Sequence, residues 1–137
     1  MGFKINKYNK KHQGAIVDLW EECGLVVPQN DPIEDIRRKV NFQPELLFVA
    51  VLDGQLIGSV MVGYEGHRGW LNYLAVHPSF QRRGFGTKLV HKAIAELRKL
   101  GCPKLNLQVR KSNAPIIGFY RHLGFKEEER VSLGMRL

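Results

Sequence analysis

Residues 79–90, SFQRRGFGTKLV, join two arginines to two glycines and lead directly into an apolar helical pattern. The first turn of a helix leaves backbone N–H groups unpaired and carries partial positive charge, so it attracts anions. Glycines let the backbone approach such an anion closely, and arginines add charge and forked donors. The stretch therefore predicts a phosphate-binding loop at the start of a helix, with a plain basic helix start as the alternative.

The spacing of the glycines excludes two familiar phosphate-binding motifs. A P-loop needs G-x-x-x-x-G-K-[ST], and a dinucleotide-binding fold needs G-x-G-x-x-G; the sequence contains neither. The phosphate is therefore expected to belong to another class of ligand.

Helical and strand patterns alternate on both sides of this loop. Apolar residues at helical spacing predict helices at 16–23, 32–40, 89–100 and 113–123, the second of them capped by Asp31 with Glu34 completing a box-like pattern. Strands are predicted at 2–6, 46–52, 56–64, 70–76, 105–109, from 124 onward and at 131–137, with Asp53-Gly54 as a hairpin turn. The order β-α-α-β-β-β-α-β-α-β-β indicates an α/β fold with a partly antiparallel sheet.

Composition and charge narrow the class of protein. The 137 residues suit one domain with one core, and the longest apolar run, 46–52, is too short to cross a membrane. Cys23 and Cys102 have no cysteine or histidine at zinc-like spacing, so we expect no metal site. The net charge of +8 favours an anionic partner, but basic residues are interleaved with acidic ones and no reader motif is present. We therefore expect a cytoplasmic protein that binds neither nucleic acid nor membrane.

Two motifs at the right separation carry a resemblance to a known family. The stretch L-A-V-H-P-x-x-Q-R-R-G-F-G-T-x-L, residues 74–89, resembles motif A of the GNAT superfamily of N-acetyltransferases. Asn113, Tyr120 and Leu123-Gly124-Phe125 resemble its motif B, although Ile116 replaces the usual alanine. The stretches NDP, GYEGHRG and SLG are most similar to the YpeA group of small bacterial acetyltransferases.

The resemblance implies a fold, a co-substrate and a set of binding residues. It implies one N-acetyltransferase domain over residues 1–137, whose mostly antiparallel mixed sheet contains a splayed parallel strand pair. It also implies that acetyl-CoA is bound as the co-substrate. The implied binding residues are Leu74, Ala75, Val76, Gln81, Arg82, Arg83, Gly84, Phe85, Gly86, Thr87, Asn113 and Tyr120. Candidates for its 3′-phosphate are Arg83, Lys88, Lys111 and Arg121.

Acetyl transfer from a thioester to an amine needs three groups. The resemblance implies that Tyr120 protonates the departing thiolate, for which a phenol of pKa ~10 is suitable at neutral pH. It implies that the backbone N–H of Leu74 stabilises the oxyanion. A core aromatic side chain is the alternative for Tyr120.

The general base is less well defined, because Trp70 and Gln108 stand where family members carry glutamates. The remaining candidates are Glu65, His67, Asp31 and Glu21. We place Glu65 and His67 first, since they lie in the turn that enters the central strand. Each has a solvated loop charge as its alternative, and water could also accept the proton from an α-amine of pKa ~8.

The acceptor is expected to bind near the first two helices and the loop before the central strand. The predicted acceptor-binding residues are Trp20, Asn30, Asp31, Tyr64, Arg68, Asn72 and Gln108. Arg68 could pair with the carboxylate of an amino acid. We expect a small-molecule amine that attacks directly in a ternary complex. Acetylation of a peptide or protein N-terminus and an acyl-CoA sensor without turnover stay open as alternatives, as does a homodimer.

Overall fold

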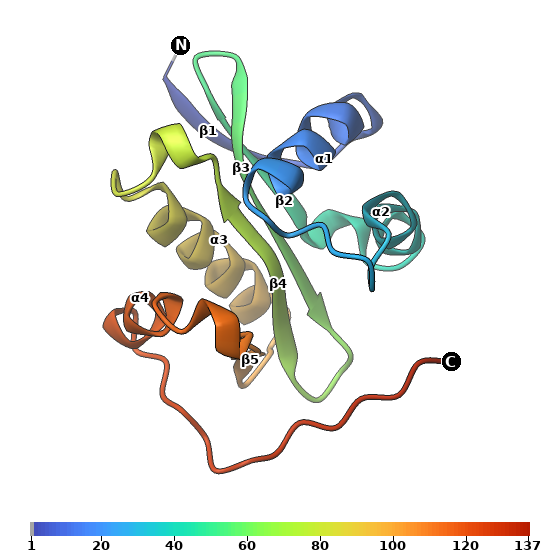
Figure 1. Cartoon of the computed structure of the whole chain (residues 1–137), viewed down its shortest axis with the longest axis vertical. Coiled ribbons are helices and arrows are strands. Elements are labelled where there is room, and N and C mark those ends of the chain that lie inside the picture. Colours follow the sequence, from blue (N-terminus) through green and yellow to red (C-terminus); the bar gives the residue numbers. More distant parts are fainter. Residues whose placement is uncertain (1) are drawn as a thin grey trace. The chain divides into compact units, whose positions relative to one another are not determined.

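The computed structural model describes residues 2–137, and in them five strands and four α-helices follow the order β1-α1-α2-β2-β3-β4-α3-β5-α4 (Figure 1). The strands are β1 (Phe3–Lys7), β2 (Leu47–Leu52), β3 (Gln55–Tyr64), β4 (Gly69–Val76) and β5 (Leu105–Leu107). The helices are α1 (Gln13–Glu22), α2 (Pro32–Val40), α3 (Phe85–Lys99) and α4 (Ile116–His122). Short 3-10 turns occur at Lys10–His12, Pro44–Leu46, Pro78–Phe80 and Lys111–Asn113.

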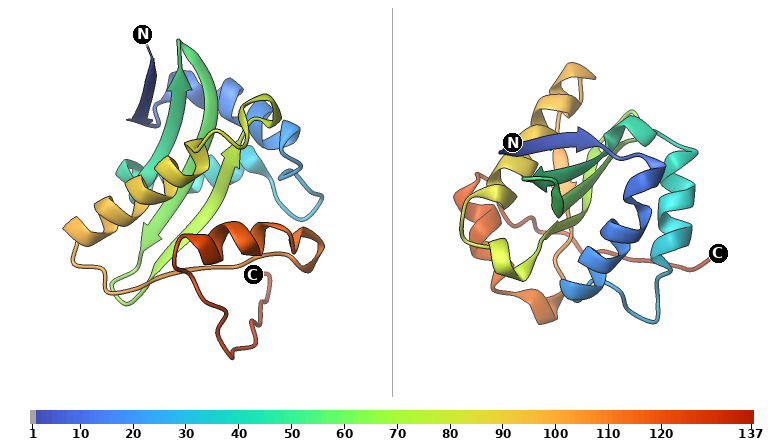
Figure 2. Two further views of the ribbon diagram at one scale, coloured as in Figure 1. Left: turned by 90° about the vertical axis from the view of Figure 1, so that its left-hand side faces the viewer. Right: turned by 90° about the horizontal axis from the view of Figure 1, so that it is seen from above.

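The chain divides into two compact units, a larger one that ends at Leu107 and a smaller one, Gln108–Leu137. The larger unit holds a sheet with strand order β1-β2-β3-β4-β5, antiparallel except for the parallel pair β4 and β5. Helix α3 lies on one face of this sheet, and α1 and α2 lie on the other (Figure 2). The predicted α/β class with a mostly antiparallel mixed sheet is therefore confirmed, while a single domain over 1–137 stays a prediction.

Local signals in the sequence set two of the boundaries. Asp53 and Gly54 both have left-handed backbone, with φ of 48° and 84°, as the tight turn between β2 and β3 requires. Asp31 caps α2 by accepting the N–H groups of Ile33 and Glu34. The predicted capping box was wrong in its second half, because the Glu34 carboxylate binds the Arg37 guanidinium at 2.8 Å instead.

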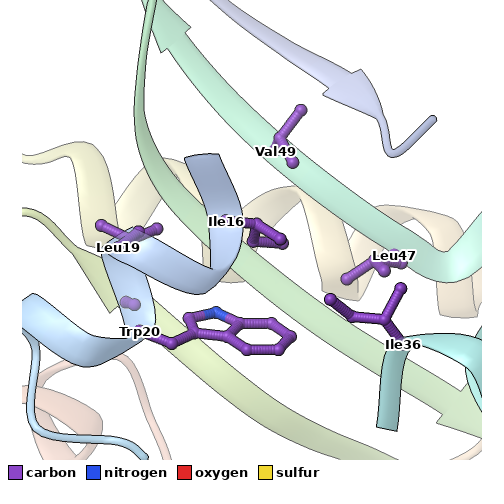
Figure 3. Packing of buried hydrophobic residues seen from close by; sticks show 7 residues of the cluster. Ile16, Leu19, Trp20, Ile36, Leu47 and Val49 are labelled. Atoms are coloured by element: carbon purple, nitrogen blue, oxygen red, sulfur yellow. The ribbon is translucent and has the colours of Figure 1, made fainter. Parts of the chain in front are cut away.

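The core between the sheet and its two N-terminal helices is built around Trp20, which is fully buried (Figure 3). Residues of α1, α2, β2 and β4 pack around it: Ile16, Leu19, Ile36, Leu47, Val49 and Ala75. Ile16, Leu19 and Trp20 share one face of α1 because three or four residues make one helical turn. This packing fixes α1 against the middle of the sheet.

The C-terminal prediction was wrong: the structure forms no strand after β5 within residues 2–137. The alternating apolar side chains Val131, Leu133, Met135 and Leu137 are all exposed. Alternation defines the two faces of a strand, but a strand also needs a partner edge for its backbone hydrogen bonds. Helix α4 also begins later than predicted, at Ile116, directly after Pro115.

Candidate functional site

The loop between β4 and α3 presents an open helix N-terminus. Gly84 occupies the N-cap position with φ of 84°, and Arg82 is left-handed as well, with φ of 63°. Glycine has no side chain with which to cap the helix, so the N–H groups of the first turn of α3 point out past Gly84. Gln81, Arg82, Arg83 and Gly84 are all exposed. The predicted anion loop therefore lies at the surface, with its glycine where a left-handed residue is needed.

Internal hydrogen bonds hold this loop in shape. The Gln81 side-chain amide donates to the carbonyl of Val76 at 2.9 Å, and the His77 N–H donates to the carbonyl of Ile57 at 2.8 Å. The Ser79 N–H donates to Nδ1 of His77 at 3.1 Å. Gln81 was predicted to bind the co-substrate, and its side chain is used here to close the loop onto the end of β4.

Two cations lie on aromatic rings beside the start of α3. The Arg83 guanidinium lies 5.2 Å from the ring centre of Phe85, and the Lys88 ammonium lies 5.0 Å from that of Phe3. The rings of Phe3 and Phe85 stack at 4.8 Å. The aromatic faces hold both cations near the helix N-terminus, where they add positive potential for an anion.

Strand β4 has an open edge and a bulge. It pairs with β5 only over Gly69–Leu71, and from Asn72 onward no strand among residues 2–137 pairs with it on that side. On its other side, Ser59 pairs with Ala75 and Met61 pairs with Asn72, so β4 has one residue more than β3 between these pairs. The extra residue of a bulge is left out of the ladder. The bulge contains Tyr73 and Leu74, and Leu74 is the predicted oxyanion donor.

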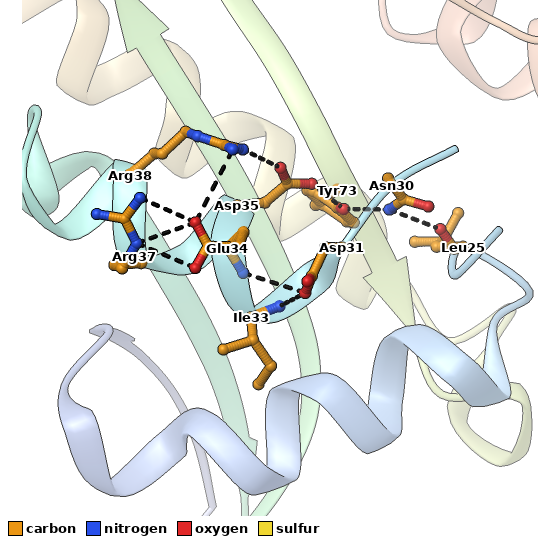
Figure 4. A network of polar contacts seen from close by, with 9 residues as sticks. All are labelled: Leu25, Asn30, Asp31, Ile33, Glu34, Asp35, Arg37, Arg38 and Tyr73. Atoms are coloured by element: carbon orange, nitrogen blue, oxygen red, sulfur yellow. Dashed lines mark hydrogen bonds and ion pairs between the residues drawn. The ribbon is translucent and has the colours of Figure 1, made fainter. Parts of the chain in front are cut away.

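A hydrogen-bond network joins the bulge to the segment between α1 and α2 (Figure 4). The Tyr73 hydroxyl accepts from the Asn30 side-chain amide at 2.5 Å and donates to the Asp35 carboxylate at 2.6 Å. The Tyr73 ring stacks on the indole of Trp20, with centroids 3.7 Å apart. The Trp20 indole N–H donates to the Ser59 hydroxyl, which donates to the Tyr73 carbonyl, both at 2.8 Å. The structure thus brings the predicted residues Trp20 and Asn30 next to the bulge.

Three members of this network, Ser59, Tyr73 and Asp35, were missed by the sequence analysis. Ser59 is the one polar residue between Gln55 and Tyr64, the two ends of β3, and a hydroxyl within such an apolar run is a signal that could have identified it. The structure buries it fully. Tyr73 and Asp35 carry no comparable signal, because their meeting depends on how β4 and α2 pack.

The turn between β3 and β4 lies at the other end of β4 from the anion loop (Figure 1). The Glu65 carboxylate accepts the backbone N–H groups of Arg68 and His67, and these hydrogen bonds lower the pKa of Glu65. Leu74 lies five positions after Gly69 along β4, which is about 16 Å at the rise of a strand. The predicted bases Glu65 and His67 are therefore exposed at a distance from the predicted oxyanion donor.

The side chains of three other predicted acceptor-binding residues form hydrogen bonds with neighbouring backbone groups. The Tyr64 hydroxyl donates to the carbonyl of Gly66 at 3.2 Å, and Arg68 donates to the carbonyl of His67 at 3.0 Å, so both serve the same turn. Asp31 caps α2. Asn72 is exposed on β4, beside the bulge.

In the smaller unit, Tyr120 is buried on α4, and its ring meets those of Phe119 and Phe125 edge-on at 5.1 and 5.6 Å. Burial raises the pKa of Tyr120 to about 12, so its hydroxyl stays protonated at neutral pH. Asn113 ends an exposed 3-10 turn, and the Gln108 side-chain amide donates to the hydroxyl of Ser132.

Residues 2–137 contain neither a metal-binding cluster nor a membrane-spanning helix. No group of three or more histidine, cysteine, aspartate or glutamate side chains in residues 2–137 could hold a metal ion. Every helix in this part of the chain is too short or too polar to cross a bilayer.

Comparison with known proteins gives consistent results. The sequence matches the acetyltransferase (GNAT) family over residues 14–125. An acetyltransferase of Yersinia enterocolitica is 48% identical over 134 residues, which cover 98% of this chain and 95% of the relative. The PaiA N-acetyltransferase of Thermoplasma acidophilum, in complex with coenzyme A, is similar with a TM-score of 0.75 and 20% identity, covering 96% of this chain and 94% of that one. AAC(6')-Iy, in complex with the bisubstrate analogue CoA-S-monomethyl-acetylneamine, is similar with a TM-score of 0.78 and 23% identity, covering 100% and 99%. At these identities the two structures establish a shared fold.

Proposed function

Because the chain belongs to the acetyltransferase (GNAT) family and is an acetyl-CoA-dependent acetyltransferase, we propose that its acceptor is the primary amine of a small, positively charged metabolite. We further propose that the amine attacks directly while both substrates are bound. In support, AAC(6')-Iy has the same fold and was captured with a bisubstrate analogue.

The open N-terminus of α3 suits the pyrophosphate of acetyl-CoA. The uncapped amides from Arg82 to Thr87 would bind the phosphate oxygens, because the first turn of a helix lacks acceptors of its own. Arg83 and Lys88 would add charge from the aromatic faces beside Phe85 and Phe3. The open edge of β4 from Leu74 to Val76 offers backbone groups to the amides of the pantetheine arm. Asn113 stays a proposed contact as well.

Acetyl-CoA supplies the acetyl thioester, and the residues of this chain supply its surroundings. We assign the Leu74 N–H as oxyanion donor, and the bulge supports this because the extra residue of a bulge is left out of the ladder. We assign Tyr120 as the hydrogen-bond donor to the thiolate. A phenol of pKa about 12 is a weaker acid than a thiol of pKa ~8.5, so Tyr120 would stabilise the thiolate without transferring its proton completely.

Removal of the proton from the amine needs no carboxylate at the β3–β4 turn. Glu65 is committed to the backbone of that turn, and its lowered pKa makes it a weaker base. We infer that the proton passes to water. This needs an acceptor amine whose pKa lies well below ~10, and a neighbouring ammonium group on the same acceptor lowers the pKa in this direction.

The charge distribution is the observation that supports a positively charged acceptor. Residues 13–36, which form α1, the following loop and the start of α2, contain no lysine or arginine, although the whole chain has a net charge of +8. The same segment contains six carboxylates. Glu34 and Asp35 form ion pairs with Arg37 and Arg38 of the same helix, which leaves Asp18, Glu21, Glu22 and Asp31 to set the potential. Negative potential at this segment would draw an ammonium group toward the bulge of β4 and disfavour acidic acceptors.

A thiol-release assay tests the proposal. Purified protein with acetyl-CoA is offered polyamines, aminoglycosides, neutral and acidic amino acids, and peptides with free N-termini, each at several salt concentrations. We expect the largest kcat/KM for acceptors with more than one ammonium group, and we expect it to fall as salt screens the attraction. A preference for peptides or for acidic amino acids would contradict the proposed acceptor class. Binding of acetyl-CoA without release of thiol for any acceptor would favour a sensor.

A further inference from the structure

Tyr73 has a backbone conformation that is rare for its residue type. Its φ is 49°, in the left-handed region, within the bulge of β4. Glycine adopts this region without steric cost, whereas a bulky residue there is an outlier. A bulge that needs a left-handed residue commonly uses glycine. The tyrosine side chain must therefore make contacts that offset the cost of its own backbone.

Buried side chains hold both the ring and the backbone carbonyl of Tyr73 in place. The ring stacks at 3.7 Å on the indole of Trp20, and Trp20 is fully buried. The Trp20 indole N–H binds the Ser59 hydroxyl, and the same hydroxyl donates to the Tyr73 carbonyl. That carbonyl belongs to the peptide group whose N–H is the N–H of Leu74. Two buried side chains thus set the orientation of the Leu74 amide.

The hydroxyl of Tyr73 reaches in the other direction, to the segment between α1 and α2 (Figure 4). It accepts from Asn30 at 2.5 Å and donates to Asp35 at 2.6 Å. Asn30 in turn organises the loop that begins at Leu25, since its side chain accepts the Val27 N–H at 2.9 Å and donates to the Leu25 carbonyl at 3.4 Å. One hydroxyl therefore ties this loop to the bulge.

We propose that Tyr73 is a positioning residue for acetyl transfer, which holds the Leu74 amide and the Leu25–Asn30 loop in one fixed arrangement. The inference rests on the proposed function, in which the Leu74 N–H receives the oxyanion and the acidic segment receives the acceptor. The two parts that must meet in the reaction are thereby joined through a single side chain. This explains why a tyrosine occupies a left-handed position where glycine has no steric cost.

The test compares Tyr73→Phe with Tyr8→Phe. Tyr73→Phe keeps the ring on Trp20 and removes only the hydroxyl. Tyr8 packs against the same core and lies outside the site, so Tyr8→Phe is the matched control. For Tyr73→Phe we expect the acceptor KM to rise about tenfold, as for the loss of one hydrogen bond to a charged group. We expect kcat to change less than this, and the Kd of acetyl-CoA to stay within about twofold.

Hydrogen exchange provides a readout that does not depend on activity. In Tyr73→Phe, amides of residues 25–31 should exchange several-fold faster, while those of α3 should be unchanged. Asp35→Asn keeps an acceptor oxygen for the tyrosine, so its loop should exchange nearly as in the original protein. Unchanged exchange of the loop in Tyr73→Phe, or a KM equal to that of Tyr8→Phe, would overturn the inference.

The same experiment separates the two proposals. If the unmutated protein acetylates no amine, the proposed function fails, and hydrogen exchange still decides whether Tyr73 anchors the loop. If Tyr73→Phe does not fold, Asn30→Asp removes the amide that donates to the Tyr73 hydroxyl and keeps the oxygen that accepts the Val27 N–H. It should raise the acceptor KM in the same way.

Discussion

Replacing Gly84 with alanine tests whether the helix N-terminus binds acetyl-CoA through its backbone. Gly84 has φ of 84°, and a Cβ at this position would meet no other atom within 4 Å. The substitution therefore adds strain without a clash, and the left-handed conformation costs an L-residue about 1–2 kcal/mol.

The cost of this strain lowers either the stability of the folded protein or its affinity for acetyl-CoA. If the exposed loop of the free protein relaxes to a negative φ, binding must restore the left-handed conformation, and the Kd of acetyl-CoA rises about 5- to 30-fold. If the loop keeps its shape, the same strain lowers Tm. With an unfolding entropy of ~2.1 cal/mol/K per residue over this chain, that fall is about 3–7 °C. Because the loop is exposed, we expect most of the cost to appear in affinity.

Gly101→Ala is the matched control, since Gly101 has φ of 78°, also has open space around its Cβ position, and lies just past the other end of α3. It should lower Tm by a similar few degrees and leave the Kd of acetyl-CoA unchanged. Isothermal titration calorimetry and a thermal melt measure both quantities. If Gly84→Ala keeps the Tm of the unmutated protein and also binds acetyl-CoA as tightly, the loop has relaxed from its left-handed conformation at no cost to binding. The loop then does not bind the pyrophosphate through its backbone.

The other predictions concern the group proposed to stabilise the departing thiolate, Tyr120, and the candidate base for the amine, Glu65. Tyr120→Phe should lower kcat about tenfold or more and leave the Kd of acetyl-CoA unchanged. Equal kcat in Tyr120→Phe and the unmutated enzyme would show that Tyr120 does not stabilise the thiolate. Because the pKa of Tyr120 is raised to about 12, the rate of the unmutated enzyme should show no loss from phenol ionisation up to pH ~10. Glu65→Gln should leave kcat at neutral pH nearly unchanged, and a large drop in kcat would reinstate Glu65 as the base. Its effect should be on stability: the lowered pKa means that the carboxylate stabilises the fold above its ordinary pKa near 4.5, and that this contribution is lost as pH falls through the lower folded value. The Tm difference between the two proteins should therefore shrink in melts below pH ~4.

Predictions that depended on adjacent residues were confirmed. The Asp53-Gly54 turn, the Asp31 cap and the helix after the glycine loop each follow from the conformational preferences of one or two residues and their nearest backbone groups. The helix begins at Phe85, earlier than the predicted 89. The C-terminal strand was wrong because its pattern met only half of the requirement. Alternating side chains mark the two faces of a strand, but hydrogen bonds to another segment are what form it.

The residues of the candidate site also differ in whether local sequence or the folded shape of the chain determines them. The sequence predicted the uncapped helix start at Gly84, because a glycine before a new helix sets this geometry locally. It could not distinguish Glu65, whose carboxylate closes its own turn, from a free base, because the hydrogen bonds to His67 and Arg68 depend on the shape of that turn.

By itself, the sequence determined the fold class and the family, and it predicted the loop proposed to bind acetyl-CoA. These depend on short stretches whose residue order fixes local geometry and on motifs at a set separation. Only the tertiary structure decided that Tyr73 takes a left-handed bulge and meets Asn30 and Asp35. Tyr73 lies some forty positions after the other two residues in the chain, and no local preference brings it to them. The packing of α1 and α2 on the sheet places them within hydrogen-bond distance, and this packing is what joins the loop between α1 and α2 to the amide proposed to stabilise the oxyanion.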